Sequence, residues 1–468
     1  MFLSSEKASN QHFSGKLYLL VLASLFGLPG YSQEPLPPQL NPQLYQIIDS
    51  VSASRLEMDI TKLVGFGTRN TLSDTTSRTQ GIGAARRWIK AEFEKISENC
   101  NNCLSVFYQD TVVPAADNRR IPADTRVVNV VAIQTGFANS GTYVLMSGDI
   151  DSRVSDALNA VDDSPGANDN ATGMAGTLEA ARILSQYKFP HNIVYAGLSG
   201  EEQGLFGGQA LARWAKQQNW NIIGVLNNDM IGNTEGIDGT IDNRSFRIFS
   251  EPTPVTDDER KRIWNRFYGG EVDGPSRQLA RYIDHLSRVY MPEMKPMMIY
   301  RLDRFGRGGH HKPFNDLGFA GVRIMETHEN YNRQHQDIRI ENGVEYGDVL
   351  EKVDFDYVQK LTAVNAITLA SLAAAPEPPG NVMIGGAVTS STTLQWDDSN
   401  DDHLLGYKIY WRETTAPQWQ FQKWVGKVNQ FTLENVIIDN FLFGVASVAK
   451  DGSESTVQFP GTLIPRRR

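Results

Sequence analysis

Short, almost continuous apolar runs constrain the fold of this chain more than any other feature. They follow residue 127 and read VVNVVAI, TYVLMSG, NIVYAGL, IIGVLNN and AGVRIM. Helix-like stretches such as MAGTLEAARILSQY and GGQALARWAKQQ separate them. Strands that helices cover on both faces lose the polar alternation of a half-exposed strand. The pattern predicts an α/β fold with a mostly parallel central sheet and helices on both faces.

The segments around this sheet indicate two domains after residue 32. Two amphipathic helices are expected near residues 42–64 and 79–99, and a proline-rich boundary, AAAPEPPGN, covers residues 373–381. Short alternating strands follow it, which predicts an all-β sandwich. We therefore expect an α/β domain over residues 33–375 and a sandwich domain over residues 376–468.

The predicted sandwich resembles a fibronectin type III module in its TLQW, GYKIYWR and FGVASVAKDGSES segments. Phe441 stands where that fold commonly has the tyrosine of its corner, so a hydroxyl contact to the backbone would be missing. Such a module more often positions or tethers an enzyme than performs chemistry. A protein or polysaccharide contact through this domain is therefore expected.

The N-terminal segment, residues 1–32, reads as a signal peptide. Lys7 and Lys16 precede the apolar stretch LYLLVLASLFGLPG, and the small residues of GYS lead to Gln33. The stretch is short for a membrane span, and no cysteine stands at the cleavage point for a lipid anchor. We expect a secreted or periplasmic protein without a stable membrane anchor; an uncleaved N-terminal anchor is the alternative.

Charge and cysteine content narrow the range of partners. The chain has 45 basic and 54 acidic residues and a formal charge of −9, which argues against nucleic acid or an anionic membrane as the main partner. A metal or a cationic substrate group fits this balance. The two cysteines, Cys100 and Cys103, lie in CNNC, and in an oxidising compartment a local disulfide is favoured over zinc or redox roles.

Acidic residues and histidines follow several of the predicted strands. Ligands of open α/β sheets bind beyond the carboxyl ends of the strands, so these side chains are expected at one edge. They are Asp149, Asp151, Glu201, Glu202, Asp229, His328 and His335, with Asp169 in the loop PGANDNATG. Buried acids would repel one another unless a cation sits among them. The pattern predicts a divalent metal site, in which Asp149 is a ligand and Asp151 orients a neighbour.

The motifs SGDIDSR, PGANDNATG, SGEEQGLFGG, NNDMIG and GGHHKPFNDLGFAGVRIMETHENYNRQH occur in the order found in secreted bacterial di-zinc aminopeptidases. These enzymes are related to glutamate carboxypeptidase and glutaminyl cyclase, and the resemblance covers roughly residues 60–370. It implies two zinc ions bridged by Asp169. Asp149 and Asp229 would complete one site, and Glu202 and His335 the other. Glu201 would be the general base.

Tyr331 is a further candidate near the last of these ligands. A tyrosine in some similar enzymes donates a hydrogen bond to the developing oxyanion, and a packing role is the alternative.

The chain departs from the family pattern at a few positions. The first ligand of the family is a histidine, whereas this chain has Asp149. Three carboxylate ligands shift a site from zinc toward harder ions such as manganese or magnesium. His310 stands where the family usually shows an acid in GDH, and His311 keeps the histidine that follows. His328 is the fallback for the final ligand.

The leading interpretation is a secreted metallo-exopeptidase that acts on peptide substrates, and an aminopeptidase is favoured. Carboxypeptidase or dipeptidase action uses the same metals, so the direction of attack stays open. A second hypothesis is a binding protein on the same fold with an impaired site. A third is a single-metal acyltransferase that cyclises N-terminal glutamine.

Overall fold

The computed structural model describes residues 36–116, 118–399 and 401–465, so the predicted signal peptide lies outside the described residues. The helices are α1 (Pro42–Asp49), α2 (Ala53–Val64), α3 (Gly81–Asn99), η1 (Ala167–Thr172), α4 (Gly173–Leu184), α5 (Glu201–Gly204), α6 (Phe206–Gln217), α7 (Glu259–Tyr268), η2 (Gly270–Val272), α8 (Pro275–Tyr290), α9 (His311–Asn315), η3 (Leu350–Lys352), α10 (Phe355–Ala374) and η4 (Ile438–Asn440). The strands are β1 (Leu104–Val113), β2 (Thr125–Gln134), β3 (Thr142–Asp149), β4 (Asn192–Leu198), β5 (Asn221–Asn228), β6 (Ser245–Ser250), β7 (Lys295–Ile299), β8 (Gly321–Glu326), β9 (Arg339–Glu341), β10 (Val344–Tyr346), β11 (Met383–Gly385), β12 (Thr392–Gln395), β13 (Leu404–Glu413), β14 (Phe421–Gly426), β15 (Gln430–Leu433), β16 (Phe441–Ala449) and β17 (Thr462–Leu463).

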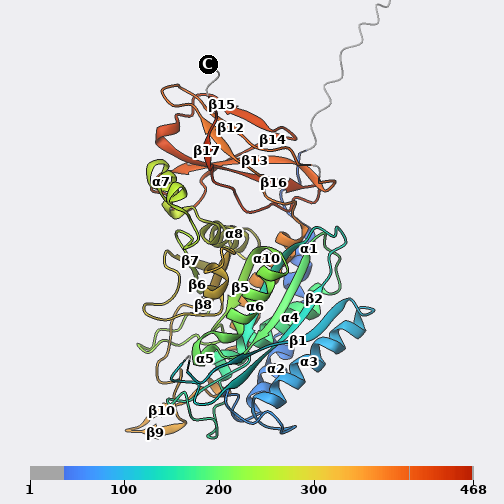
Figure 1. Ribbon diagram of the computed structural model, residues 1–468, viewed down its shortest axis with the longest axis vertical. Coiled ribbons are helices and arrows are strands. Elements are labelled where there is room, and N and C mark those ends of the chain that lie inside the picture. Colours follow the sequence, from blue (N-terminus) through green and yellow to red (C-terminus); the bar gives the residue numbers. More distant parts are fainter. Residues whose placement is uncertain (1–35, 117, 400, 466–468) are drawn as a thin grey trace, which may run out of the picture. The chain divides into compact units, whose positions relative to one another are not determined.

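The central sheet has eight strands in the order β1-β2-β4-β3-β5-β8-β6-β7 (Figure 1). Its middle four strands are parallel, because β3 pairs in parallel with β4 and β5, and β5 with β8. The run VVNVVAI forms part of β2, which pairs antiparallel with β4, and β6 is antiparallel to β8. The predicted α/β class is confirmed, with a mixed sheet whose parallel centre brings four strand ends to one edge.

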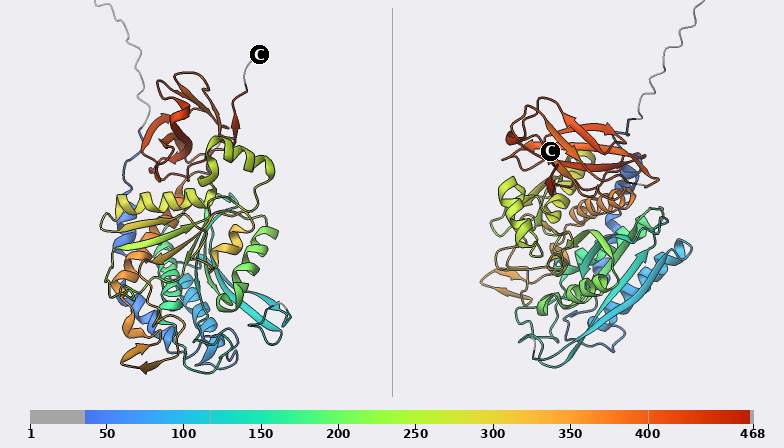
Figure 2. Two further views of the ribbon diagram at one scale, coloured as in Figure 1. Left: turned by 90° about the vertical axis from the view of Figure 1, so that its left-hand side faces the viewer. Right: turned by 45° about the horizontal axis from the view of Figure 1, so that its top comes forward.

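Side chains of the central strands alternate between two apolar cores, one on each face of the sheet. Val144 and Met146 of β3 belong to the larger core, together with residues of α1 to α4, α8 and α10. Leu145 points to the other core, with residues of α6 and α9. Figure 2 shows helices on both sides of the sheet. The central strands β3, β4 and β8 are buried on both faces, which explains their lack of polar alternation.

The helical stretch expected over residues 42–64 is divided into α1 and α2. Ser52 has an extended backbone, and its hydroxyl accepts a hydrogen bond from the amide of Arg55, which caps the start of α2. The second expected helix is α3, and the predicted disulfide between Cys100 and Cys103 follows it, as confirmed by the structure. In the described part of the chain, every helix is too short or too polar to span a membrane.

The chain after α10 forms two small sheets, β15-β12-β11-β17 and β14-β13-β16. Trp396, Tyr407 and Val445 lie in the apolar core of this part. The β-rich C-terminal part is therefore confirmed, and Phe441 is the first residue of β16. Its assignment to fibronectin type III stays a prediction.

A buried ion-pair cluster joins these C-terminal strands to the residues around α8. Asp273 accepts from Arg281 of α8 at 2.7 Å and from Arg412 of β13 at 2.7 Å. The three side chains are at most 1 % exposed. Because two guanidinium groups share one carboxylate away from water, the cluster depends on Asp273.

Replacement of Asp273 by alanine is expected to lower the free energy of unfolding by about 3–5 kcal/mol, since it leaves two buried cations without their carboxylate. Urea unfolding followed by circular dichroism measures this. The control Asp316→Ala removes the carboxylate of an exposed pair with Lys312 and should cost about 1 kcal/mol or less. Equal losses in both variants would contradict this role of Asp273.

Candidate metal centre

The predicted acids meet at the carboxyl edge of the parallel strands. Asp149 is the last residue of β3, Asp229 directly follows β5, and Glu201 begins α5 shortly after β4. Adjacent parallel strands end on the same side, which brings these residues together although about 80 residues of chain separate Asp149 from Asp229.

Asp169, Glu202 and His335 form a compact group of potential ligands. One ligand atom from each lies within 4.8 Å of the others. The Nε2 atom of His335 is 2.9 Å from Asp169 Oδ2 and 2.9 Å from Glu202 Oε1. Two carboxylates and one imidazole are a donor set that zinc accepts in catalytic sites, where water takes the fourth position. We call these three residues the triad; their donor atoms fit a zinc ion.

Asp348 holds the loop that carries Asp169. Its carboxylate accepts from the amide of Asn168 at 2.8 Å and from the amide of Asp169 at 2.7 Å. Gln334, next to His335 in the chain, donates to Asp169 Oδ2 at 3.2 Å. Asp348 was not predicted from the sequence, because it lies 179 residues from Asp169 and outside the motifs.

Arg153 contacts two members of the triad. Its Nε atom is 3.2 Å from Glu202 Oε2, and its Nη2 atom is 3.0 Å from His335 Nδ1. The guanidinium therefore orients both side chains and offsets part of the local negative charge. This residue was also missed, although it lies in the quoted motif SGDIDSR.

Glu201 lies beside the triad but is not part of it. Burial raises the pKa of Glu201 well above its usual range, and the negative charges of Glu202 and Asp229 add to the increase. A carboxylate with a raised pKa next to potential metal ligands is a candidate to accept and return a proton.

Asp151 fixes the start of α5. Its carboxylate accepts from the backbone amides of Glu201 at 3.3 Å and Glu202 at 3.1 Å, and from Thr71 Oγ1 at 3.0 Å. A carboxylate at a helix N-terminus satisfies amides that have no partner within the helix. Asp151 thus positions both glutamates through their backbone.

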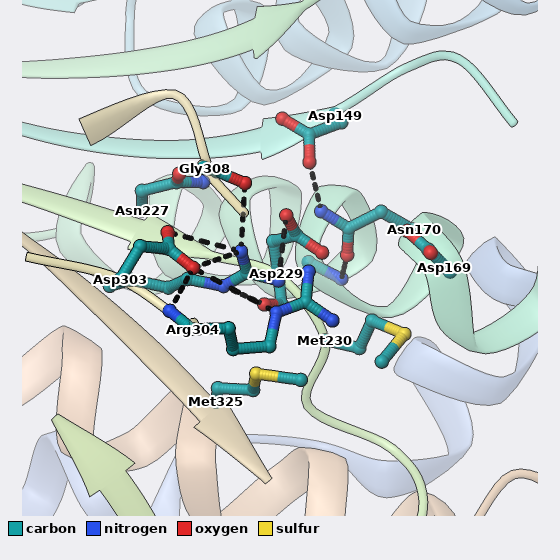
Figure 3. A network of polar contacts seen from close by, with 12 residues as sticks. Asp149, Asp169, Asn170, Asn227, Asp229, Met230, Asp303, Arg304, Gly308 and Met325 are labelled. Atoms are coloured by element: carbon teal, nitrogen blue, oxygen red, sulfur yellow. Dashed lines mark hydrogen bonds and ion pairs between the residues drawn. The ribbon is translucent and has the colours of Figure 1, made fainter. Parts of the chain in front are cut away.

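The carboxylate of Asp149 is occupied by protein partners. Its Oδ1 atom lies 2.6 Å from His310 Nδ1. Its Oδ2 atom accepts from Asn170 Nδ2 at 2.7 Å, a contact drawn in Figure 3. Burial raises the pKa of Asp149 to about 8, although the bond from Asn170 opposes this change. Burial also lowers the pKa of His310 to about 4.

The carboxylate of Asp229 is paired with Arg323, a fully buried residue of β8. The Nη2 atom of Arg323 is 3.0 Å from Asp229 Oδ2. Burial by itself lowers the pKa of Arg323, but Asp229 and Asp303 raise it above its ordinary value, so the guanidinium is charged. The signal for this residue was a lone arginine inside the apolar run AGVRIM.

The remaining candidates, Tyr331, His328 and His311, are not members of the triad. Tyr331 is 58 % exposed. His328, the fallback ligand, has its Nε2 atom 3.7 Å from Asp242 Oδ2. The Nε2 atom of His311 is 2.8 Å from the carbonyl oxygen of Leu302.

Comparisons with known proteins identify the family of this chain. The model of "Peptidase family M28" matches residues 129–343. A "Probable zinc metalloprotease" of Leptosphaeria maculans is 41% identical over 424 residues, which are 90% of this chain and 98% of that protein. Another from Pyrenophora tritici-repentis is 40% identical over 434 residues, 92% of this chain and 89% of that protein. The chain belongs to peptidase family M28.

The solved structures extend the likeness to the fold. The LapA aminopeptidase of Legionella pneumophila aligns with a TM-score of 0.51 and 16% identity, over 74% of this chain and 79% of that one. The two relatives described above are fungal, whereas the motifs pointed to a bacterial group.

Replacement of Asp151 by asparagine is expected to lower kcat/KM about 10–100-fold, as for other residues that orient metal ligands, because an amide is a weaker acceptor for the amides of α5. The control Thr71→Val removes only the hydroxyl bond to Asp151 and should have a smaller effect. Steady-state kinetics with metal analysis measure both. Wild-type kcat/KM in the Asp151 variant would show that its bonds to α5 are not needed.

Proposed function

We propose that this protein is a secreted zinc-dependent exopeptidase, and specifically an aminopeptidase that removes N-terminal residues from peptides. The single observation that carries this proposal is the position of Glu201 beside the Asp169, Glu202 and His335 triad. Membership of peptidase family M28 and the zinc metalloprotease names of the fungal relatives support it.

The triad would hold the zinc ion. When bound, zinc polarises a substrate carbonyl and lowers the pKa of water. Glu201 would take a proton from the attacking water and deliver it to the leaving amine, a role that suits a carboxylate with a raised pKa. Asp151 and Arg153 would hold the two glutamates and His335 in position.

The acidic surroundings favour the amino end of a peptide over its carboxyl end. Asp149, Glu201 and Asp229 lie near the triad, and a carboxylate-rich site attracts an α-amino group but repels a terminal carboxylate. Cyclisation of N-terminal glutamine is the second candidate, because one compact ligand triad suits a single-metal reaction.

The variant Glu201→Gln is expected to lower kcat about 10²–10⁴-fold while zinc remains bound, because the amide cannot accept the proton. Aminoacyl nitroanilides and defined peptides serve as substrates, with metal content measured in parallel. Glu341→Gln, an equal charge change at an exposed position, should retain full activity. Chelation should abolish turnover, and zinc should restore it.

Several outcomes of this assay would refute the proposal. Release of C-terminal residues alone would reverse the direction of attack. Conversion of a glutaminyl peptide to its pyroglutamyl form without hydrolysis would favour cyclisation. No turnover with any bound metal would favour a binding protein.

Export is tested separately from catalysis. The mature protein is expected in the extracellular or periplasmic fraction with an N-terminus at or near Gln33, because the signal segment would be removed there. N-terminal sequencing and fractionation measure this. A membrane-bound protein that retains Lys7 would instead show an uncleaved anchor. The C-terminal strands would contact a protein or polysaccharide outside the cell.

A further inference from the structure

We propose that the guanidinium group of Arg323 takes the place of a second metal ion, so that this protein binds one metal ion per chain, in the triad. This inference rests on the proposed function in one respect, which is that the triad is the zinc site. It concerns the other two carboxylates that the resemblance assigns to metal, Asp149 and Asp229.

Arg323 contacts Asp229 from inside the sheet edge. Its Nη2 atom is 3.0 Å from Asp229 Oδ2, and its Nε atom donates to the backbone carbonyl of the same residue. The side chain of Arg323 is 0% exposed. Its charge therefore offsets that of Asp229 without a metal ion, in a region where an unpaired carboxylate is costly.

The opposite side of the guanidinium is held equally firmly. Nη1 of Arg323 donates to both carboxylate oxygens of Asp303, at 3.1 and 3.2 Å, and to the carbonyl oxygen of Gly308 at 3.0 Å. Figure 3 shows Asp303 and Gly308 in this network beside Asp229. A metal ion at Asp229 would have to displace a buried cation that has protein partners on both sides.

Both carboxylate oxygens of Asp149 already have partners within the protein. Oδ1 pairs with His310 and Oδ2 with Asn170, whose amide also donates to the carbonyl oxygen of Asn228 at 2.7 Å. A metal ion at this position would have to share these oxygens with His310 and Asn170.

Asp149 and His310 are two positions at which this chain departs from the family pattern, and their side chains are in contact. The family has histidine at the first position and usually an acid at the second, and this chain has the reverse order. The 2.6 Å contact preserves an imidazole–carboxylate pair but removes the imidazole from position 149. Among the described residues, the triad is the group whose three ligand atoms lie within 4.8 Å of one another. Asp229 Oδ1 and His310 Nε2 have no hydrogen-bond partner among the described residues, so what opposes a second ion is the buried charge of Arg323 against Asp229.

Metal stoichiometry of the full-length native protein tests this inference directly. Chelated protein is titrated with zinc, passed through a desalting column and analysed by inductively coupled plasma mass spectrometry. We expect one equivalent of zinc per chain at saturation. Two equivalents would overturn the inference even if the protein is an active aminopeptidase. One equivalent without peptidase activity would refute the proposed function and leave the inference standing.

Variants test which residue excludes a second metal ion. Arg323→Met removes the charge and keeps a side chain of similar length, so it is expected to raise the zinc content from one to two equivalents per chain. Arg323→Lys keeps the charge and should stay at one equivalent. The control Arg288→Met, which changes an exposed arginine on α8, should also stay at one. Circular dichroism confirms that each variant is folded. Asp149→His alone is also expected to stay at one, because Arg323 still pairs with Asp229.

Two outcomes would overturn the role of Arg323. A folded Arg323→Met variant that keeps one equivalent would show that its charge does not exclude a second ion. A second equivalent in Asp149→His would assign the exclusion to position 149. If Arg323→Met does not fold, the native stoichiometry and the Asp149→His variant still decide the matter.

Discussion

Repulsion among buried carboxylates is the constraint on which the rest of this site depends. The parallel strands deliver acids to one edge, where burial makes an uncompensated charge expensive. Cations must therefore lie among them. The structure provides two arginines, Arg153 and Arg323, and a triad whose geometry suits a metal ion.

The two arginines divide the site into two halves with different chemistry. Arg153 lies beside Glu202 and His335, whose side chains it contacts and orients. Arg323 neutralises Asp229 directly. On the proposal of a single metal ion, the charge balance of one half is built into the chain, whereas the other half would depend on an added ion. This division would account for a site in which position 149 is an aspartate.

Much of this arrangement could be predicted from the sequence. Buried strands predicted the α/β class, and the rule that ligands bind at strand ends predicted that Asp149, Glu201 and Asp229 lie at one edge. The direction of the strands could be predicted less well. The strand β2 is antiparallel to β4. The sequence did not show this, because an apolar run indicates burial on both faces but not the direction of the strand.

Side-chain partners across long sequence distances were the least predictable feature. Asp149 and His310 are 161 residues apart, so the sequence showed two separate departures where the structure shows one contact. The direction of Arg323 within β8 depends on the register of that strand, which residue spacing does not determine.

Anomalous diffraction at the zinc edge, from crystals of the zinc-loaded protein, is the most direct measurement of the metal site. A single anomalous peak should lie between Asp169 and Glu202, within bonding distance of His335 Nε2, with the guanidinium of Arg323 against Asp229. A peak elsewhere, or none among these three residues, would contradict the assignment of the triad as the metal centre.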